Sequence, residues 1–144
     1  MEKFHNPPEA EIRELLSRTH VIAVVGLSPK LQRPSHQVAS RMQEFGYRII
    51  PVRPAIYEVL NEKAYASLRE VPDRIELVDV FRAPQHVDGI VDQCIELRLP
   101  ALWLQDGVIN PQAARRARDA GIEVVMNRCV YRDYVNFFGM ARHA

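Results

Sequence analysis

The 144-residue chain has the length of one ordinary domain, enough to bury a core without disulfides or metals. Its 19 basic and 18 acidic residues give a formal net charge of +1, which provides no overall attraction to nucleic acid or an acidic membrane. No apolar run approaches the roughly 20 residues of a membrane span, and residues 1–6 hold no secretory segment. Cys94 and Cys129 could form one bridge, but reduced thiols in a cytoplasmic protein are the simpler interpretation.

Short apolar runs alternate with helical patterns along the chain. Apolar runs predict strands at residues 21–25, 48–52, 77–81, 101–104 and 123–126. Helical spacing predicts helices at about 8–19, 35–45, 87–95, 111–120 and 131–141. Asn6 is a candidate cap for the first helix, and Asn110 caps the fourth. Residues 53–73 are less regular and include a turn at 71–73.

Strands that alternate with helices form βαβ units, whose right-handed crossovers give a parallel sheet. We therefore predict a single α/β domain over residues 1–144, with a doubly wound sheet of about five strands and helices on both faces. The chain is too short for a (β/α)₈ barrel, which needs roughly 250 residues. Pro51 indicates that the second strand ends early or lacks a partner on one side.

The loop after the first strand has the chemistry of a phosphate site. Ligands of such sheets bind beyond the carboxyl ends of the strands, where the strand order reverses. Gly26 is the one glycine kept from a G-x-G-x-x-G fingerprint, and Ser28 replaces the second. Ser28 and Ser35 offer hydroxyls, Lys30 and Arg33 offer charge, and the next helix offers its N-terminus. The alternative is a polar crossover loop with two solvated cations.

Three further residues follow neighbouring strands. Arg53 stands where an NAD-binding domain has an acidic residue, and it suits an additional ribose phosphate, as in NADP or coenzyme A (CoA). An exposed arginine without a partner is the competing interpretation. Phe81 and Arg82 could stack on and hydrogen-bond an adenine, although Phe81 could equally be a core residue. Gln105 could line the same crevice.

The sequence contains no catalytic constellation that we recognise, neither G-x-S-x-G, Walker A nor H-E-x-x-H, and no metal-like pairing of histidine with cysteine. We expect no catalytic residue and no metal ligand. His36 is expected on a helix surface, and Cys129 is expected to be an inert thiol near the crevice. Asp79, inside the third strand, is expected to be held by backbone donors.

An ordered set of short motifs carries a family resemblance. The chain resembles the stand-alone bacterial and archaeal CoA-binding domain proteins, which are similar to the CoA-binding domain of the succinyl-CoA synthetase alpha chain. The resemblance runs from about Val21 to about Cys129. It rests on Val24–Ser28, Arg33–Ser35, Gly46–Tyr47, Ile50–Pro54, Val78–Arg82, Trp103–Gln105 and Met126–Cys129.

The resemblance implies a Rossmann-like sheet with CoA across the strand ends. It implies a phosphate loop formed by Gly26, Ser28, Lys30, Arg33 and Ser35, and an adenosine site flanked by Val52, Arg53, Pro54, Phe81 and Arg82. The chain departs from the family at Arg53, where asparagine is usual, and at Asn61, where glycine is usual. Arg53 could add a salt link to a ribose phosphate or obstruct the pocket, whereas Asn61 can adopt the left-handed conformation that glycine provides.

We therefore expect a module that binds CoA or an acyl-CoA and does no chemistry itself. The related ligases carry a further domain with a phosphorylated histidine, and the chain ends before any such domain, so ligase activity is not expected. One alternative is an NADP(H)-linked oxidoreductase that uses Arg53 for the extra phosphate. The other is an interaction protein with a vestigial pocket that docks through Tyr134, Phe137 and Phe138, although such a stripe more often covers the protein's own sheet.

Overall fold

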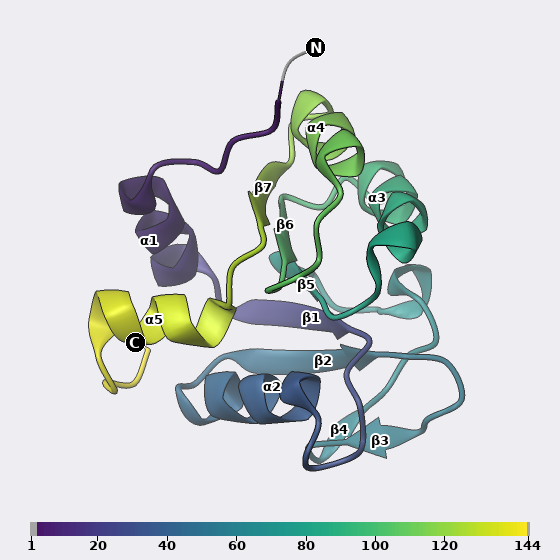
Figure 1. Cartoon of the computed structure of the whole chain (residues 1–144). Helices are drawn as coiled ribbons and strands as arrows, with labels where there is room; N and C mark the ends of the chain where they lie inside the picture. Colours follow the sequence, from purple (N-terminus) through teal and green to yellow (C-terminus); the bar gives the residue numbers. More distant parts are fainter. Residues whose placement is uncertain (1–2, 144) are drawn as a thin grey trace.

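In the computed structural model, which describes residues 3–143, five parallel strands form one sheet with helices on both faces (Figure 1). The strands are β1 (Val21–Val25), β2 (Arg48–Val52), β5 (Leu77–Val80), β6 (Ala101–Leu104) and β7 (Glu123–Met126). The helices are α1 (Glu9–Arg18), α2 (Pro34–Glu44), α3 (Val87–Glu96), α4 (Pro111–Asp119) and α5 (Val130–Phe138). The predicted α/β fold, a Rossmann-like doubly wound sheet, is confirmed.

In the strand order β2-β1-β5-β6-β7, the point at which the order of the strands reverses lies between β1 and β5. From β1 the chain crosses outward to β2, and it then returns to the other side of β1 to form β5. Val24 of β1 is thus in register with Pro51 on one side and with Asp79 on the other. The loops after β1 and β5 diverge at this point, so a ligand crevice is expected at their carboxyl ends.

Alternate side chains of β1 supply two apolar layers. Ile22 and Val24 face the layer that α1, α2 and α5 cover, whereas Ala23 and Val25 face the layer under α3 and α4. Figure 1 shows α1 and α5 together on one side of the strands and α3 and α4 on the other. A strand covered on both faces must be apolar throughout, which is why its sequence shows no alternation.

The aromatic stripe of α5 packs inside this domain. Tyr134 is buried, its ring stacks on Phe45 with the centroids 4.1 Å apart, and it meets the edge of Tyr47. Phe137 and Phe138 are partly buried against the same core. These rings therefore cover the protein's own sheet, and the Tyr134 ring is not available as a docking handle.

The irregular segment after β2 contains an unpredicted hairpin of β3 (Glu58–Val59) and β4 (Glu62–Lys63). Its two-residue turn has positive φ at Leu60 (57°) and Asn61 (61°), so Asn61 does take the left-handed conformation. Strands of two residues are too short to leave a periodic pattern, and the sequence therefore gave no sign of them. Pro51 lies in β2 at the edge of the main sheet, as its ring requires.

The N-terminal segment is tied to the opposite edge of the sheet. The Asn6 amide donates to the Met126 carbonyl at 2.9 Å, and its oxygen accepts from the Met126 N–H at 2.7 Å. The expected cap on the first helix is therefore wrong, because Pro8 occupies that position and makes no side-chain hydrogen bond. Asn110 does cap α4, accepting from the Ala113 N–H at 3.1 Å.

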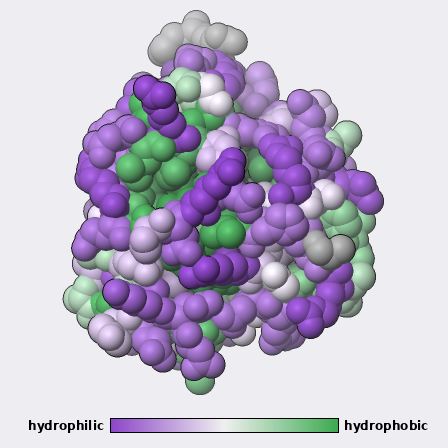
Figure 2. Space-filling view, turned by 180° about the vertical axis from the view of Figure 1, so that it is seen from behind, coloured by the Kyte–Doolittle hydropathy of each residue, from purple (hydrophilic) through white to green (hydrophobic). Residues whose placement is uncertain are grey.

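None of the described helices is long and apolar enough to cross a membrane. Hydrophilic residues cover most of the face turned away in Figure 1, and hydrophobic residues gather there in a hollowed area (Figure 2).

The side chain of Asp79, on central strand β5, is fully buried, and its Oδ1 has no hydrogen-bond partner. The expected backbone donors are absent at this oxygen, so that expectation is wrong. Burial raises the pKa of the Asp79 carboxyl well above its ordinary value. The folded protein therefore holds the proton of this carboxyl more tightly than the unfolded chain does.

We expect the free energy of unfolding to fall as the pH rises above about 4, where only the unfolded state releases this proton. Asp79→Asn should remove that part of the pH dependence because an amide does not titrate. Urea unfolding at pH 5 and pH 8 measures the effect, which should amount to about 1.4 kcal/mol for each pH unit over which only the folded state keeps the proton. The exposed carboxylate variant Glu14→Gln is the control. If the free energy of unfolding of Asp79→Asn changed with pH as much as that of the wild-type protein, Asp79 would not be the source of the pH dependence.

Candidate ligand-binding site

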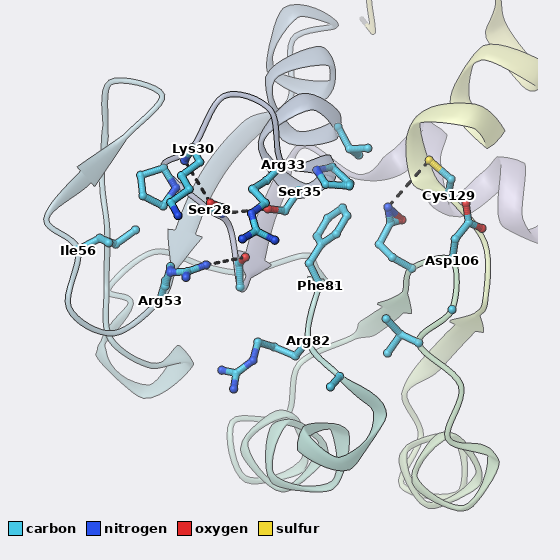
Figure 3. Close-up of a pocket in the computed structure, with 18 of the residues that line it drawn as sticks. Ser28, Lys30, Arg33, Ser35, Arg53, Ile56, Phe81, Arg82, Asp106 and Cys129 are labelled. Atoms are coloured by element: carbon cyan, nitrogen blue, oxygen red, sulfur yellow. Dashed lines mark hydrogen bonds between the residues drawn. The ribbon is translucent and has the colours of Figure 1, made fainter.

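A cavity of about 860 Å³ opens at the carboxyl ends of β1, β2, β5 and β6, beside the start of α2 (Figure 3). Nine of the ten predicted site residues line it: Gly26, Ser28, Lys30, Arg33, Ser35, Arg53, Pro54, Phe81 and Arg82. Val52 does not, because its side chain is buried in the core under α3 and α4. The loops thus meet around one space that the strand order creates.

The loop after β1 is held by its two serines. The Ser28 N–H donates to Ser35 Oγ at 2.9 Å, and the Lys30 N–H donates to Ser28 Oγ at 3.1 Å. Each hydroxyl oxygen therefore accepts a bond from the loop, and no described hydrogen bond uses either hydroxyl as a donor. The N-terminus of α2 at Arg33 has no side-chain cap. Hydroxyl donors and a helix N-terminus consequently face the cavity together, an arrangement that suits an anion.

His36 belongs to the support of this loop and not to the surface. It is buried, and its Nδ1 lies 2.9 Å from the Ser28 carbonyl oxygen. The expectation of an exposed helix position is wrong because the first turn of α2 folds under the loop. The ring helps to fix Ser28, while the cavity lining itself contains no histidine among the described residues.

Gly26 allows β1 and β5 to approach closely at the crevice. Its φ is +88°, and a Cβ placed there would lie 2.5 Å from the Phe81 carbonyl oxygen and 3.0 Å from Arg82 Cδ. A contact of 2.5 Å with a backbone atom is too short for any carbon, so only glycine fits. The residue is therefore required by sterics as well as by its backbone conformation.

Four cationic side chains gather at one end of the cavity (Figure 3). Lys30 and Arg33 are exposed on the loop, and Arg53 and Arg82 are half-buried after β2 and β5. Arg53 Nη1 donates to the Gly26 carbonyl at 3.3 Å. None of the four forms an ion pair within the described part of the chain, so their positive potential is uncompensated.

The other end of the cavity is neutral. Its lining includes Gln105, Asp106, Gly107, Val108 and Cys129. The Asp106 carboxylate forms a two-bond pair with the Arg132 guanidinium at 2.8 and 2.9 Å, which lowers its pKa and cancels its charge. In Figure 3 Phe81 stands between this end and the cationic one.

Cys129 directly precedes α5, and its thiol sulfur is buried in the cavity wall, 3.9 Å from Gln105 Nε2. Burial raises the pKa of the Cys129 thiol and outweighs the nearby N–H groups of Arg132 and Tyr131, which favour the thiolate. The thiol is therefore protonated at neutral pH and a poor nucleophile. The Cys94 thiol, in the core, has its pKa raised by burial to about 12, and both cysteines are free.

The apolar wall of the cavity beside Arg53 was not predicted from the sequence. Val38 of α2 and Ile56 of the loop after β2 line the cavity, but nothing in their spacing distinguishes them from core or surface residues. Ala55, between Pro54 and Ile56, has φ +66°, and all three residues line the cavity. A proline flanked by strand and irregular residues signals a turn without revealing its direction. No group of three or more metal-ligating side chains occurs within residues 3–143.

Comparison with known proteins identifies the class. The model of the CoA binding domain family matches residues 20–134, which include every strand of the sheet and all the lining described above. The chain belongs to this CoA binding domain family.

Its relatives include both stand-alone proteins and parts of ligases. The chain is 42% identical over 127 residues to the uncharacterized protein YneT of Bacillus subtilis, covering 88% of this chain and 94% of YneT. A hypothetical protein of Pyrococcus horikoshii has a similar structure, with TM-score 0.90, 37% identity and coverage of 96% and 100%. An ADP-forming acetate–CoA ligase of Archaeoglobus fulgidus is 25% identical over 81 residues, 56% of this chain but 12% of the ligase.

We predict that Gly26→Ala destabilises the fold by about 2–5 kcal/mol, because it combines a left-handed residue with overpacking against the Phe81 carbonyl. Gly121→Ala is the matched control, since Gly121 also has positive φ (+92°) but no atom within 4 Å of the added Cβ. It should lose only about 1–2 kcal/mol. Equal losses in urea unfolding would argue against the close approach of β1 and β5.

Proposed function

We propose that the protein binds CoA or an acyl-CoA in this cavity, at the carboxyl edge of the sheet, as a non-catalytic module. The observation that carries the proposal is the polarity of the cavity. Four cations without acidic partners gather at one end, and the lining of the other is neutral because Arg132 cancels Asp106. CoA has the matching division, with a diphosphate and a ribose phosphate at one end and an uncharged pantetheine arm at the other.

The phosphate loop supplies the first half of the match. Lys30, Arg33, two serine hydroxyls and the uncapped N-terminus of α2 can receive a diphosphate without the glycine triplet of dinucleotide sites. Phe81, Val38 and Ile56 offer apolar surface for an adenine. The neutral lining from Gln105 to Val108 offers amide and backbone groups to a pantetheine arm.

Two features support a binding role over a catalytic one. The lining contains no histidine among the described residues, and its one cysteine has a protonated thiol. Asp106 is engaged by Arg132 and is unsuited to act as a base, because its pKa is lowered. A nucleophile, its base and an orienting group do not come together here.

CoA titrated into ligand-free protein by calorimetry should bind, and Lys30→Ala/Arg33→Ala should weaken binding about tenfold or more. The loss reflects two missing charge-assisted contacts, and the remaining affinity should vary less with salt. The control Lys63→Ala/Arg74→Ala removes the same charge outside the cavity and should bind normally.

The protein is denatured and refolded before the titration, so that it carries no CoA from purification. Mass spectrometry of the small molecules released on denaturation identifies any ligand that co-purified. Absence of heat at millimolar CoA would reject the proposal. Binding of NADPH without binding of CoA would favour the oxidoreductase alternative, because NADP also carries a ribose phosphate.

A further inference from the structure

Two of the four cations in the cavity, Arg53 and Arg82, form a unit separate from the phosphate loop. They follow β2 and β5, the two strands that flank β1 in the sheet. Both are half-buried, whereas Lys30 and Arg33 are exposed. Figure 3 shows Lys30 and Arg33 on the Ser28 side of Arg53, and Arg82 on its other side.

Both arginines converge on Gly26. Arg53 reaches it from one side through the bond from Nη1 to the Gly26 carbonyl. Arg82 packs against it from the other, since its Cδ would lie 3.0 Å from a Cβ at Gly26. The absence of a side chain at Gly26 thus leaves room for the Arg82 stem at the end of β1, and Arg53 is held there by its bond to the Gly26 carbonyl.

This arrangement is electrostatically incomplete. Apart from the long bond to Gly26, the described residues offer the Arg53 guanidinium no hydrogen bond, and they offer the Arg82 guanidinium none. By contrast, the half-buried Arg128 pairs with Asp133 at 2.6 Å and with Glu9 at 3.3 Å. Partial burial of a charge without a counter-charge is unfavourable, so the pair is expected to receive an anion.

The charge of the two arginines matches a phosphate monoester. A monoester carries about −1.5 to −2 charges and three acceptor oxygens near pH 7, and each guanidinium can donate to two oxygens at once. The bridging phosphates of a diphosphate carry one charge each and suit the serine hydroxyls and helix terminus. We propose that Arg53 and Arg82 bind the terminal ribose phosphate of CoA and make the protein select CoA over its precursor lacking that phosphate, dephospho-CoA.

This inference rests on the proposed function, and calorimetry with CoA and dephospho-CoA tests the two separately. Wild-type protein should bind CoA at least about tenfold more tightly than dephospho-CoA. Arg53→Gln and Arg82→Gln should each weaken CoA binding by about tenfold and leave dephospho-CoA binding within about twofold. Arg74→Gln, an exposed arginine outside the cavity, is the control and should change neither affinity.

The other possible results distinguish a failure of the ribose-phosphate subsite from a failure of CoA binding. Equal affinities of wild-type protein for the two ligands, or equal losses for both in the arginine variants, would overturn the ribose-phosphate subsite and leave CoA binding intact. Failure of wild-type protein to bind either ligand would overturn the proposed function itself. Circular dichroism and urea unfolding of the variants distinguish a lost contact from a lost fold.

Discussion

The contact on which the site depends is the approach of Gly26 to the Phe81 carbonyl. A Cβ would lie 2.5 Å from that oxygen, so the ends of β1 and β5 meet there at a distance that excludes every other residue. The strand order reverses at this same place, and the loops after β1 and β5 leave in different directions. The ends of β1 and β5 are thus in contact at the base of the crevice, and the loops that follow them separate to form its opening.

The other parts of the site are arranged around this contact between Gly26 and Phe81. The loop after Gly26 is held by hydrogen bonds within its own polar groups, so its serine hydroxyls and the start of α2 face one space. Arg53 and Arg82 are delivered by the strands on either side. The neutral end is supplied by β6 and the start of α5, where Gln105 accepts from the Val130 N–H at 2.9 Å. Charge separation along the cavity is therefore a property of strand order.

Apolar runs predicted all five main strands because a buried parallel strand must be apolar on both faces, and α3 was evident from its helical periodicity. The cavity-lining residues that follow strand ends were predictable because topology alone places them at one edge of the sheet. The β3–β4 hairpin was not predictable, since strands of two residues carry no period. His36, Asp79 and Asn6 were misjudged because their partners, or the lack of them, depend on tertiary packing: Ser28, an apolar layer and Met126 respectively.

The bonds between Asn6 and Met126 have a consequence for association between molecules. β7 is an edge strand, and an edge strand presents unpaired N–H and C=O groups to which another chain can add. The Asn6 amide occupies both groups of Met126 as a neighbouring peptide would, so a strand from a second molecule cannot pair continuously along β7. The Asn6 side chain thus disfavours edge-to-edge association of two molecules through β7.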